Sequence, residues 1–338
     1  MSYRLLRFVF FLFDPEKIHD VIVQLLSLRP VQWFLSLVYH YEHPRLEREF
    51  FGIRFKNPVG IAAGFDKNGK AILGLQALGA GFLEVGTVTP QPQSGDKKPR
   101  ILRFKEQKAL VNWMGFNNDG VDRVIGRIER VRPKIKIPIG LNIGKGTGTP
   151  LEDAAVDYMA CMERAYRAID FFVVNVSSPN TAQLRDLQAE AYLSPLLSRL
   201  KLASTEIAGK YHMKERPMLL KLSPDLSDAE ISQIIHACKK QRISGIVATN
   251  TTTEYTLLPA HGMALGGISG QPLKNKSENC LKLLKRLGAL NFPMIGVGGI
   301  ASARDALSRI EAGASLIELF TGLIYEGPSL IKKIKQTL

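Results

Sequence analysis

Ser178 lies in residues 171–180, FFVVNVSSPN, where a short apolar, β-branched run ends in small polar residues. A strand buried on both faces reads as a continuous apolar run, and polar residues at the carboxyl ends of such strands carry the chemistry of α/β proteins. Ser178 is therefore a candidate catalytic group, and the nearby amides of Asn175 and Asn180 suit a polar, planar substrate. The alternative is that Ser-Ser-Pro-Asn only ends the strand in a turn, because all of these residues are common in turns.

Lys221 interrupts a second apolar run, MLLKLSP, and lysine is almost never fully buried without a partner. We expect it to face an anion or an electron-rich ring. Neutral polar groups end other apolar runs, namely Asn142, Asn250, and Thr249 or Thr251. Such groups suit a heterocycle rather than a metal, and the sequence has no cluster of His, Asp and Glu with ligand spacing. We expect no metal site.

A repeated strand and helix pattern positions these groups. Apolar runs that end in Gly, Asn, Thr, Ser or Lys occur at residues 58–67, 82–90, 137–146, 171–180, 218–225, 244–252, 293–300 and 315–322. Most are separated by helix-like stretches, such as 151–168 and 228–240, where apolar positions recur every three or four residues. Eight such repeats predict an α/β fold, a closed (β/α)8 TIM barrel. An open doubly wound sheet is the alternative, but no GxGxxG follows the first strand.

The loops after the seventh and eighth predicted strands are where such barrels commonly bind a phosphate. Gly298 and Gly299 follow the seventh strand, and Phe320, Thr321 and Gly322 follow the eighth. Backbone amides next to glycine would hold the phosphate. A tight turn without a ligand is the alternative for the glycine pair.

The composition agrees with one large catalytic domain, which we place at residues 41–338, and an N-terminal extension. The chain has 338 residues, of which 45% are hydrophobic, enough for a sizeable core. Three scattered cysteines, Cys161, Cys238 and Cys280, form no CxxC pair and indicate a reducing compartment. The formal charge of +14 is spread along the chain without a nucleic-acid motif, so an anionic membrane surface is the better candidate partner than nucleic acid.

Residues 1–40 carry the pattern of a membrane-associated helical hairpin. Asp14, Pro15 and Glu16 form a good helix start. Two apolar stripes follow, Ile18, Val21, Ile22, Leu25 and Leu26 in the first predicted helix and Val31, Phe34, Leu35 and Val38 in the second. The apolar stretch at 3–13 is too short to span a bilayer but suits the membrane interface. The alternative is a hairpin that only caps the barrel bottom.

Seven short motifs, in order along the chain, carry a family resemblance. They are AAGFDK (62–67), GTVTP (86–90), NWMGFN (112–117), NIG (142–144), NVSSPN (175–180), ATNTT (248–252) and GVGG (296–299). Together, and with DPEKIH at 14–19, they resemble class 2 dihydroorotate dehydrogenase, the membrane-associated, quinone-linked type, from end to end. The resemblance implies an FMN-containing barrel that oxidises dihydroorotate to orotate in pyrimidine biosynthesis, with a quinone as final electron acceptor.

The resemblance also implies residue roles. The residues expected to hold FMN are Ala62, Ala63, Gly64, Phe65, Asp66, Thr87, Asn142, Asn175, Lys221, Thr249, Gly270, Gly298, Gly299, Phe320 and Thr321. Those expected to hold the substrate are Lys67, Asn112, Trp113, Met114, Gly115, Phe116, Asn175, Asn180, Asn250 and Thr251. Ser178 would be the base that removes the C5 proton while hydride passes from C6 to flavin N5. Lys221 would stabilise negative charge on the reduced flavin. His19 and Arg103 would line the quinone path.

The same resemblance implies a peripheral enzyme on the cytoplasmic side of a bacterial inner membrane, or on the mitochondrial inner membrane in a eukaryote. Residues 1–40 would give membrane contact and quinone access, and no obligatory protein partner is expected.

The chain departs from the family pattern in three places. Trp113 replaces an arginine, Ala182 and Gln183 replace Pro-Gly after Ser178, and Phe320 replaces a tyrosine. Two other functions stay open on the residues alone. One is a different flavin or phosphate-binding barrel enzyme, including a soluble class that uses NAD or fumarate, and the other is a non-catalytic, membrane-docked binding module.

Overall fold

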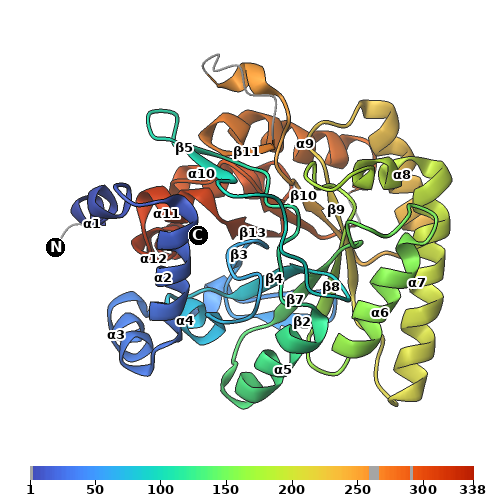
Figure 1. Cartoon of the computed structure of the whole chain (residues 1–338), viewed down its shortest axis with the longest axis horizontal. Helices are drawn as coiled ribbons and strands as arrows, with labels where there is room; N and C mark the ends of the chain where they lie inside the picture. The colour runs from blue at the N-terminus through green and yellow to red at the C-terminus, as the bar shows by residue number, and fades with distance from the viewer. Residues whose placement is uncertain (1–2, 259–265, 290–291) are drawn as a thin grey trace.

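The structure is a computed structural model of the chain, and it describes residues 3–258, 266–289 and 292–338. Parallel strands close into a barrel in the order β10-β12-β13-β3-β4-β7-β8-β9 (Figure 1). The strands are β3 (Val59–Ile61), β4 (Phe82–Val88), β7 (Ile139–Ile143), β8 (Phe171–Asn175), β9 (Met218–Leu222), β10 (Gly245–Ala248), β12 (Met294–Val297) and β13 (Leu316–Leu319). Each lies in one of the eight predicted apolar runs, so the predicted (β/α)8 barrel is confirmed.

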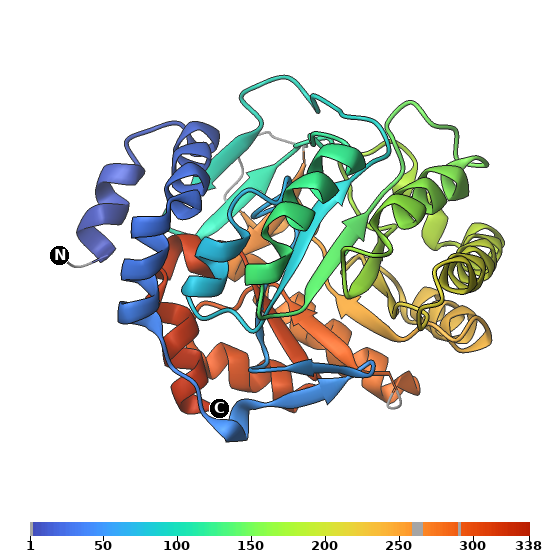
Figure 2. The same cartoon turned by 90° about the horizontal axis from the view of Figure 1, so that it is seen from below.

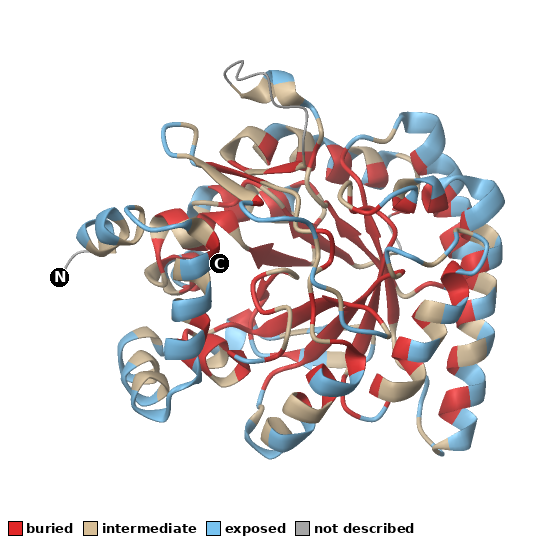
Figure 3. Cartoon of the chain, in the orientation of Figure 1, coloured by how far each residue is buried: buried red, intermediate tan, exposed pale blue. Residues whose placement is uncertain are grey.

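Helices surround the barrel and bury their apolar faces against it (Figure 3). They are α4 (Ile72–Ala77), α5 (Val121–Val131), α6 (Ala154–Ala165), α7 (Glu190–Lys210), α8 (Asp228–Lys240), α9 (Lys274–Arg286), α10 (Ala303–Glu311), α11 (Thr321–Glu326) and α12 (Ser329–Thr337). The predicted helix at 228–240 is α8, which begins with a capping box between Ser227 and Glu230. Short 3₁₀ turns complete the connections, at η1 (Pro44–Leu46), η2 (Arg132–Lys134), η3 (Leu184–Gln188), η4 (Tyr255–Leu257) and η5 (Gln271–Leu273).

An aromatic hairpin closes the bottom of the barrel. Strands β1 (Arg48–Phe50) and β2 (Ile53–Phe55) pair antiparallel and lie beneath the barrel in Figure 2. Phe55 packs edge-to-face on Phe82 with ring centroids 5.4 Å apart, and Phe171 belongs to the same buried cluster. The lower barrel interior is therefore apolar, and polar groups begin only nearer the carboxyl ends of the strands.

The N-terminal extension contains the two predicted helices, α2 (Pro15–Ser27) and α3 (Arg29–Tyr39), and a further helix before them, α1 (Tyr3–Phe10). Residues 1 and 2 of the expected extension lie outside the described residues. The predicted start of α2 is confirmed, because the Asp14 carboxylate accepts hydrogen bonds from the backbone amides of Glu16 and Lys17 at 3.1 and 2.9 Å. Helices α2 and α3 pack against α4, and α1 packs against α11. The extension thus lies beside the barrel (Figure 2), while the β1–β2 hairpin caps its bottom.

Among the described residues, no single helix has the length and apolarity needed to cross a membrane. Helices α2 and α3 meet such a test only as a pair, and they meet at 87°. A small antiparallel sheet, β5 (Ile101–Phe104), β6 (Ala109–Asn112) and β11 (Gly267–Gly270), lies over the barrel mouth near α2. In this sheet Asn112 pairs with Gly267, which brings residues far apart in sequence to one edge of the mouth.

Candidate active site

One continuous cavity of about 820 Å³ extends from the carboxyl ends of the barrel strands to the space between α2 and α3. It contains all the predicted site residues except Asn142 and Trp113. Trp113 comes directly after β6 and does not line the cavity, whereas Asn112 and Met114 on either side of it do. The expected contact of Trp113 with the substrate is therefore not supported by its position. Asn142 lies one layer behind the cavity wall.

Asn142 positions the residues in front of it. The Asn175 amide donates to Thr87 Oγ1 at 3.0 Å and to Asn142 Oδ1 at 3.1 Å. The Thr87 hydroxyl donates to the same Asn142 oxygen at 2.5 Å, and Asn142 Nδ2 donates to Glu84 Oε1 at 2.5 Å. These bonds fix the side chains of Asn175 and Thr87, which line the cavity.

Ser178 lies just beyond β8, with 6% of its surface exposed. Its hydroxyl oxygen accepts a hydrogen bond from the backbone amide of Asn180 at 3.3 Å. The Asn180 side-chain amide donates to the Asn112 backbone oxygen at 3.1 Å and to its Oδ1 at 3.2 Å. Asn250 Nδ2 donates to Ser177 Oγ at 3.1 Å. Side-chain amides therefore surround a buried serine hydroxyl, with donors and acceptors suited to a ring that carries amide groups.

Lys67 supplies positive charge to the same part of the cavity. Its ammonium group donates to Asn117 Oδ1. Burial, and then the nearby charge of Arg100, lower the pKa of Lys67 to about 7. An anionic ligand beside Lys67 would favour the protonated form.

Lys221 is a buried residue of the cavity wall and pairs with a buried carboxylate. Its ammonium group lies 2.9 Å from Glu84 Oε2. Burial alone would lower the pKa of Lys221, but the Glu84 charge outweighs burial and the pKa is raised. Burial alone would likewise raise the pKa of Glu84, but Lys221 and the hydrogen bonds to this carboxylate lower it. Lys221 is thus held in its charged form next to the cavity, as its place in an apolar strand predicted.

Sequence reasoning missed the two buried acids near Lys221, which are Glu84 and Glu318. Glu84 interrupts the apolar run FLEVGTV and Glu318 interrupts SLIELF, which is the same signal that singled out Lys221. Glu318 lines the cavity and is 1% exposed. Sequence reasoning also missed Arg185, whose side chain donates a hydrogen bond to the backbone carbonyl oxygen of Ser177, next to Ser178.

The glycine pair after β12 forms a cradle at the other end of the cavity. Gly298 and Gly299 have φ angles of +109° and +70°, in a region that side chains disfavour. A Cβ on Gly299 would lie 2.4 Å from the Cα of Lys274, so only glycine fits. The backbone is held from behind by Arg309, whose Nη2 donates to the Gly298 carbonyl at 2.9 Å. Across the cradle, the Thr321 and Ser269 hydroxyls lie 2.8 Å apart.

This arrangement fits FMN. The Thr249 hydroxyl is buried without a hydrogen-bond partner in the described part of the chain, and it lines the cavity where a ligand atom would satisfy it. Lys221 offers a fixed positive charge, and the Gly298–Gly299 cradle with Thr321 offers donors to a phosphate.

The two residues predicted to line a quinone path lie on the α2 side of the cavity. His19 Nε2 lies 2.8 Å from the Phe65 carbonyl oxygen, and burial lowers the pKa of His19. Arg103 donates to the carbonyl oxygens of Phe10 and Phe13 and stacks over the Phe11 ring at 4.7 Å. Both side chains therefore connect the N-terminal extension to the barrel mouth.

The fold and site define a barrel enzyme that binds a phosphorylated, planar cofactor next to a polar ring substrate. The family profile described as dihydroorotate dehydrogenase matches residues 45–338. The chain is 47% identical over 336 residues to a dihydroorotate dehydrogenase (quinone) of Photobacterium profundum, covering 99% of each chain. It is 44% identical to a protein of the same name from Vibrio parahaemolyticus, over the full length of both.

Solved structures agree with the sequence comparison. Ligand-free dihydroorotate dehydrogenase of Eimeria tenella superposes with a TM-score of 0.84 at 34% identity, covering 96% of this chain and 94% of the other. The same enzyme in complex with ferulenol gives a TM-score of 0.83 at 33% identity, with 96% and 90% coverage.

The chain belongs to the dihydroorotate dehydrogenase family, and its full-length relatives are of the quinone type. Its activity is the oxidation of dihydroorotate to orotate in pyrimidine biosynthesis, with FMN as cofactor and a quinone as electron acceptor.

Proposed function

We propose that Ser178 is the catalytic base of this reaction. The observation that carries the proposal is its burial at the end of β8, within the same cavity as Lys67 and the amides of Asn112, Asn180 and Asn250. FMN, when bound, supplies the hydride acceptor. The substrate carboxylate would lie against Lys67, the amides would orient the ring, and Ser178 would take the C5 proton. Serine is a poor base at its ordinary pKa, so the closed pocket must stabilise its proton loss.

The test is a Ser178→Ala variant, followed by stopped-flow measurement of flavin reduction by dihydroorotate. The variant should keep FMN and orotate binding but reduce flavin at least about 100-fold more slowly, which is typical of losing a general base. Ser178→Cys should keep part of the rate, because a thiolate forms more easily. Ser198→Ala, on α7 outside the cavity, is the matched control. Near-normal reduction by Ser178→Ala would remove this serine from the mechanism.

The same proposal assigns the FMN contacts. The isoalloxazine ring would lie over Lys221 and Asn175, near Thr249, with its phosphate on Gly298, Gly299 and Thr321. The remaining cavity residues predicted for FMN, including Ala62, Ala63, Gly64, Gly270 and Phe320, would complete the pocket. Phe320 packs edge-to-face on Phe65 at 5.9 Å, so the phenylalanine in place of the usual tyrosine has a packing role of its own.

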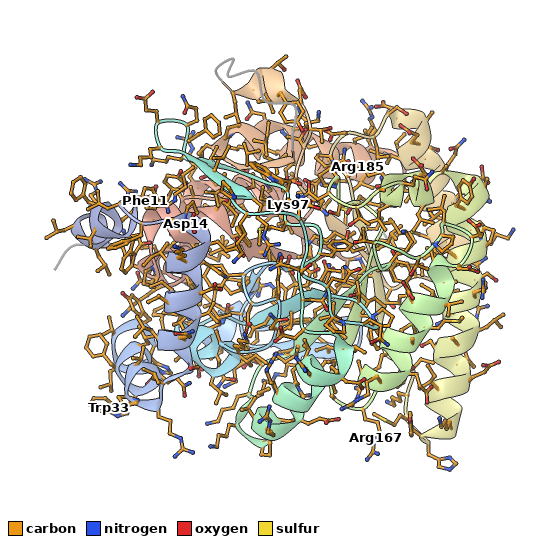
Figure 4. All side chains as sticks on the ribbon, in the orientation of Figure 1. Phe11, Asp14, Trp33, Lys97, Arg167 and Arg185 are labelled. Carbon is orange, nitrogen blue, oxygen red and sulfur yellow. The ribbon has the colours of Figure 1, made fainter. Side chains whose placement is uncertain are left out.

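We further propose that residues 1–40 form a separate unit for quinone access and membrane contact, with 41–338 as the catalytic domain. Of the large apolar side chains exposed in the described residues, twelve of fifteen lie in this extension. Figure 4 shows Trp33 on the outer side of α3, away from the barrel. Residues of α2 and α3 line one part of the cavity, so a hydrophobic quinone would reach the flavin from that side. Peripheral attachment to the cytoplasmic side of a bacterial inner membrane fits this geometry.

A further inference from the structure

Glu318 lies in the barrel interior, on the wall of the cavity that would hold the cofactor. It is on β13, where Leu316 belongs to the apolar lower layer and Phe320 lines the cavity above. Because alternate residues of a strand point to the same face, all three side chains point inward. Glu318 is therefore a carboxyl group at the boundary between the apolar floor of the barrel and the cofactor.

Both oxygens of Glu318 are buried and have no hydrogen-bond donor among the described residues. The neighbouring strands offer none, since β3 contributes Gly60 and Ala62 and β12 contributes Ile295 and Val297 at the inner face. The charged groups that face Glu318 are Glu84 from β4 and Lys221 from β9.

Glu84 is already well supplied with donors. It accepts from Lys221 at 2.9 Å, from Asn142 at 2.5 Å and from the backbone amide of Ala63 at 3.5 Å. Lys221 makes its ion pair with Glu84, not with Glu318. The layer thus contains two carboxyl groups and one ammonium group, and the ion pair is complete without Glu318.

The net charge of Glu84, Lys221 and Glu318 together determines whether Glu318 is protonated. If both acids were ionised, the buried layer would carry an uncompensated negative charge, which is costly away from water. A proton on Glu318 makes the layer neutral and allows its O–H to donate to Glu84, which satisfies an otherwise unpartnered group. Burial and then the Glu84 charge raise the pKa of Glu318 well above its usual range.

We propose that Glu318 carries an exchangeable proton beneath the flavin and makes the flavin's reduction potential depend on the protonation of this residue. The proposal rests on the FMN placement above. Reduced flavin adds negative charge over the layer, so reduction favours the protonated form of Glu318. Hydride transfer brings two electrons and one proton to the flavin, and where Glu318 is ionised in the oxidised enzyme it takes up one further proton from solvent on reduction.

The test compares the flavin midpoint potential of the holoenzyme with that of Glu318→Gln at several pH values. Glutamine keeps the size of the side chain and can donate to Glu84, but it cannot ionise. In the pH range where Glu318 is ionised in the oxidised enzyme and protonated in the reduced enzyme, reduction of the wild type should take up about one more proton per two electrons than reduction of the variant. The midpoint potential of the wild type should therefore fall more steeply with pH in that range. At lower pH the two slopes should coincide. Parallel lines over the whole range in which the protein stays folded would overturn the proposal.

Infrared spectroscopy gives a second, independent readout. The wild-type holoenzyme should show a protonated-carboxyl carbonyl band that is lost as the pH rises, and that is absent from Glu318→Gln. Glu311→Gln, on the exposed side of α10, is the matched control and should keep the band. In Glu84→Gln, Glu318 becomes the only carboxyl group beside Lys221, so the band should disappear at lower pH than in the wild type. A wild-type spectrum without this band at any pH would contradict the proposal even if Glu318→Gln failed to fold.

The two proposals fail separately. If dihydroorotate still reduced Ser178→Ala at a near-normal rate, the assignment of the base would be wrong, while the infrared band of Glu318 would be unaffected. If the flavin ring did not lie over Lys221, the infrared band of Glu318 would persist, but the midpoint potentials of the wild type and Glu318→Gln would fall in parallel as the pH rises.

Discussion

Arg185 donates from Nε to the carbonyl oxygen of Ser177 at 3.2 Å, one residue before the proposed base. Its Nη2 donates to the Thr251 carbonyl at 2.9 Å, and its Nη1 lies 3.0 Å from Asp225 Oδ2. One guanidinium group therefore ties the loop after β8 to the loop after β10. The first loop carries Ser178 and Asn180 and the second carries Asn250 and Thr251, and all four line the cavity.

Replacing Arg185 with alanine should misplace these loops without removing any group that touches the substrate. We expect kcat/KM for dihydroorotate to fall about 10- to 100-fold, because small displacements of reacting groups are costly. FMN content should not change. Arg185→Lys should recover little, since an ammonium group lacks the planar set of donors. Arg199→Ala, at an exposed position of α7, is the control. An unchanged kcat/KM would show that the loops hold their geometry unaided.

We expect Lys67 to make orotate binding depend on pH. Its pKa is lowered to about 7, first by burial and then by the charge of Arg100. The lysine is charged below that pH, so the free enzyme should bind the orotate carboxylate best there. As the pH rises above 7, the Kd should increase by up to about tenfold per unit. Titrating the flavin spectrum with orotate at each pH measures this, and Lys67→Gln should give a weaker and flatter profile. A wild-type Kd constant from pH 6 to roughly 9 would contradict the role.

The barrel strands and the start of α2 could be predicted well, because the residue patterns that indicate them lie within or directly beside each element. The eight barrel strands were visible as apolar runs, and the start of α2 was visible in Asp14 and Pro15. Helix α1 was not predicted as a helix, because a short apolar stretch is compatible with several conformations. The β1–β2 hairpin was also missed, since its Phe51 and Gly52 turn gives only a brief pattern.

Contacts across the barrel could not be predicted from spacing. Lys221 was expected to have a partner, but Glu84 lies 137 residues earlier and reaches it only when the barrel closes. Arg185 likewise reaches Thr251 across 66 residues. The family resemblance supplied most of the cavity residues by position. It also assigned Trp113 to the substrate, and that residue does not line the cavity, although Asn112 and Met114 on either side of it do.

Lys221→Ala should affect both stability and the flavin. Removing the ammonium group leaves the buried Glu84 carboxylate unpaired, which costs about 3–5 kcal/mol unless the acid takes up a proton. The flavin should be retained less well or have a lower reduction potential, because the reduced ring loses its counter-charge. Urea unfolding and potentiometry measure the two effects.

A double variant separates these effects of Lys221. Lys221→Met with Glu84→Gln removes both charges, so it should regain most of the lost free energy of unfolding without restoring the flavin potential. Glu84→Gln alone, which keeps the lysine charge, is the reference for the potential, because both variants lack the carboxylate. Equal potentials in Glu84→Gln and the double variant would show that the lysine charge has no direct effect on the flavin.

The last prediction concerns the outer surface of α3. Trp33 and Leu37 are 66% and 62% exposed there, and neither lines the cavity. Replacing both with serine should weaken binding to anionic liposomes at least about tenfold, because each large apolar side chain gains roughly 1.5–3 kcal/mol on leaving water. Turnover with a long-chain quinone in liposomes should fall with it, while dihydroorotate should reduce the flavin at the wild-type rate.

Leu202 provides a matched control, because it is 63% exposed on α7 and belongs to the barrel rather than to the extension. Leu202→Ser should leave liposome binding unchanged. Deleting residues 1–40 should likewise lower turnover with the long-chain quinone and leave flavin reduction by dihydroorotate intact. The deletion should also cost some stability, because Glu16 pairs with the buried Arg100 at 2.7 Å. If the α3 variant bound liposomes and used the long-chain quinone as the wild type does, the extension would be a structural cover for the cavity and the membrane would be contacted elsewhere.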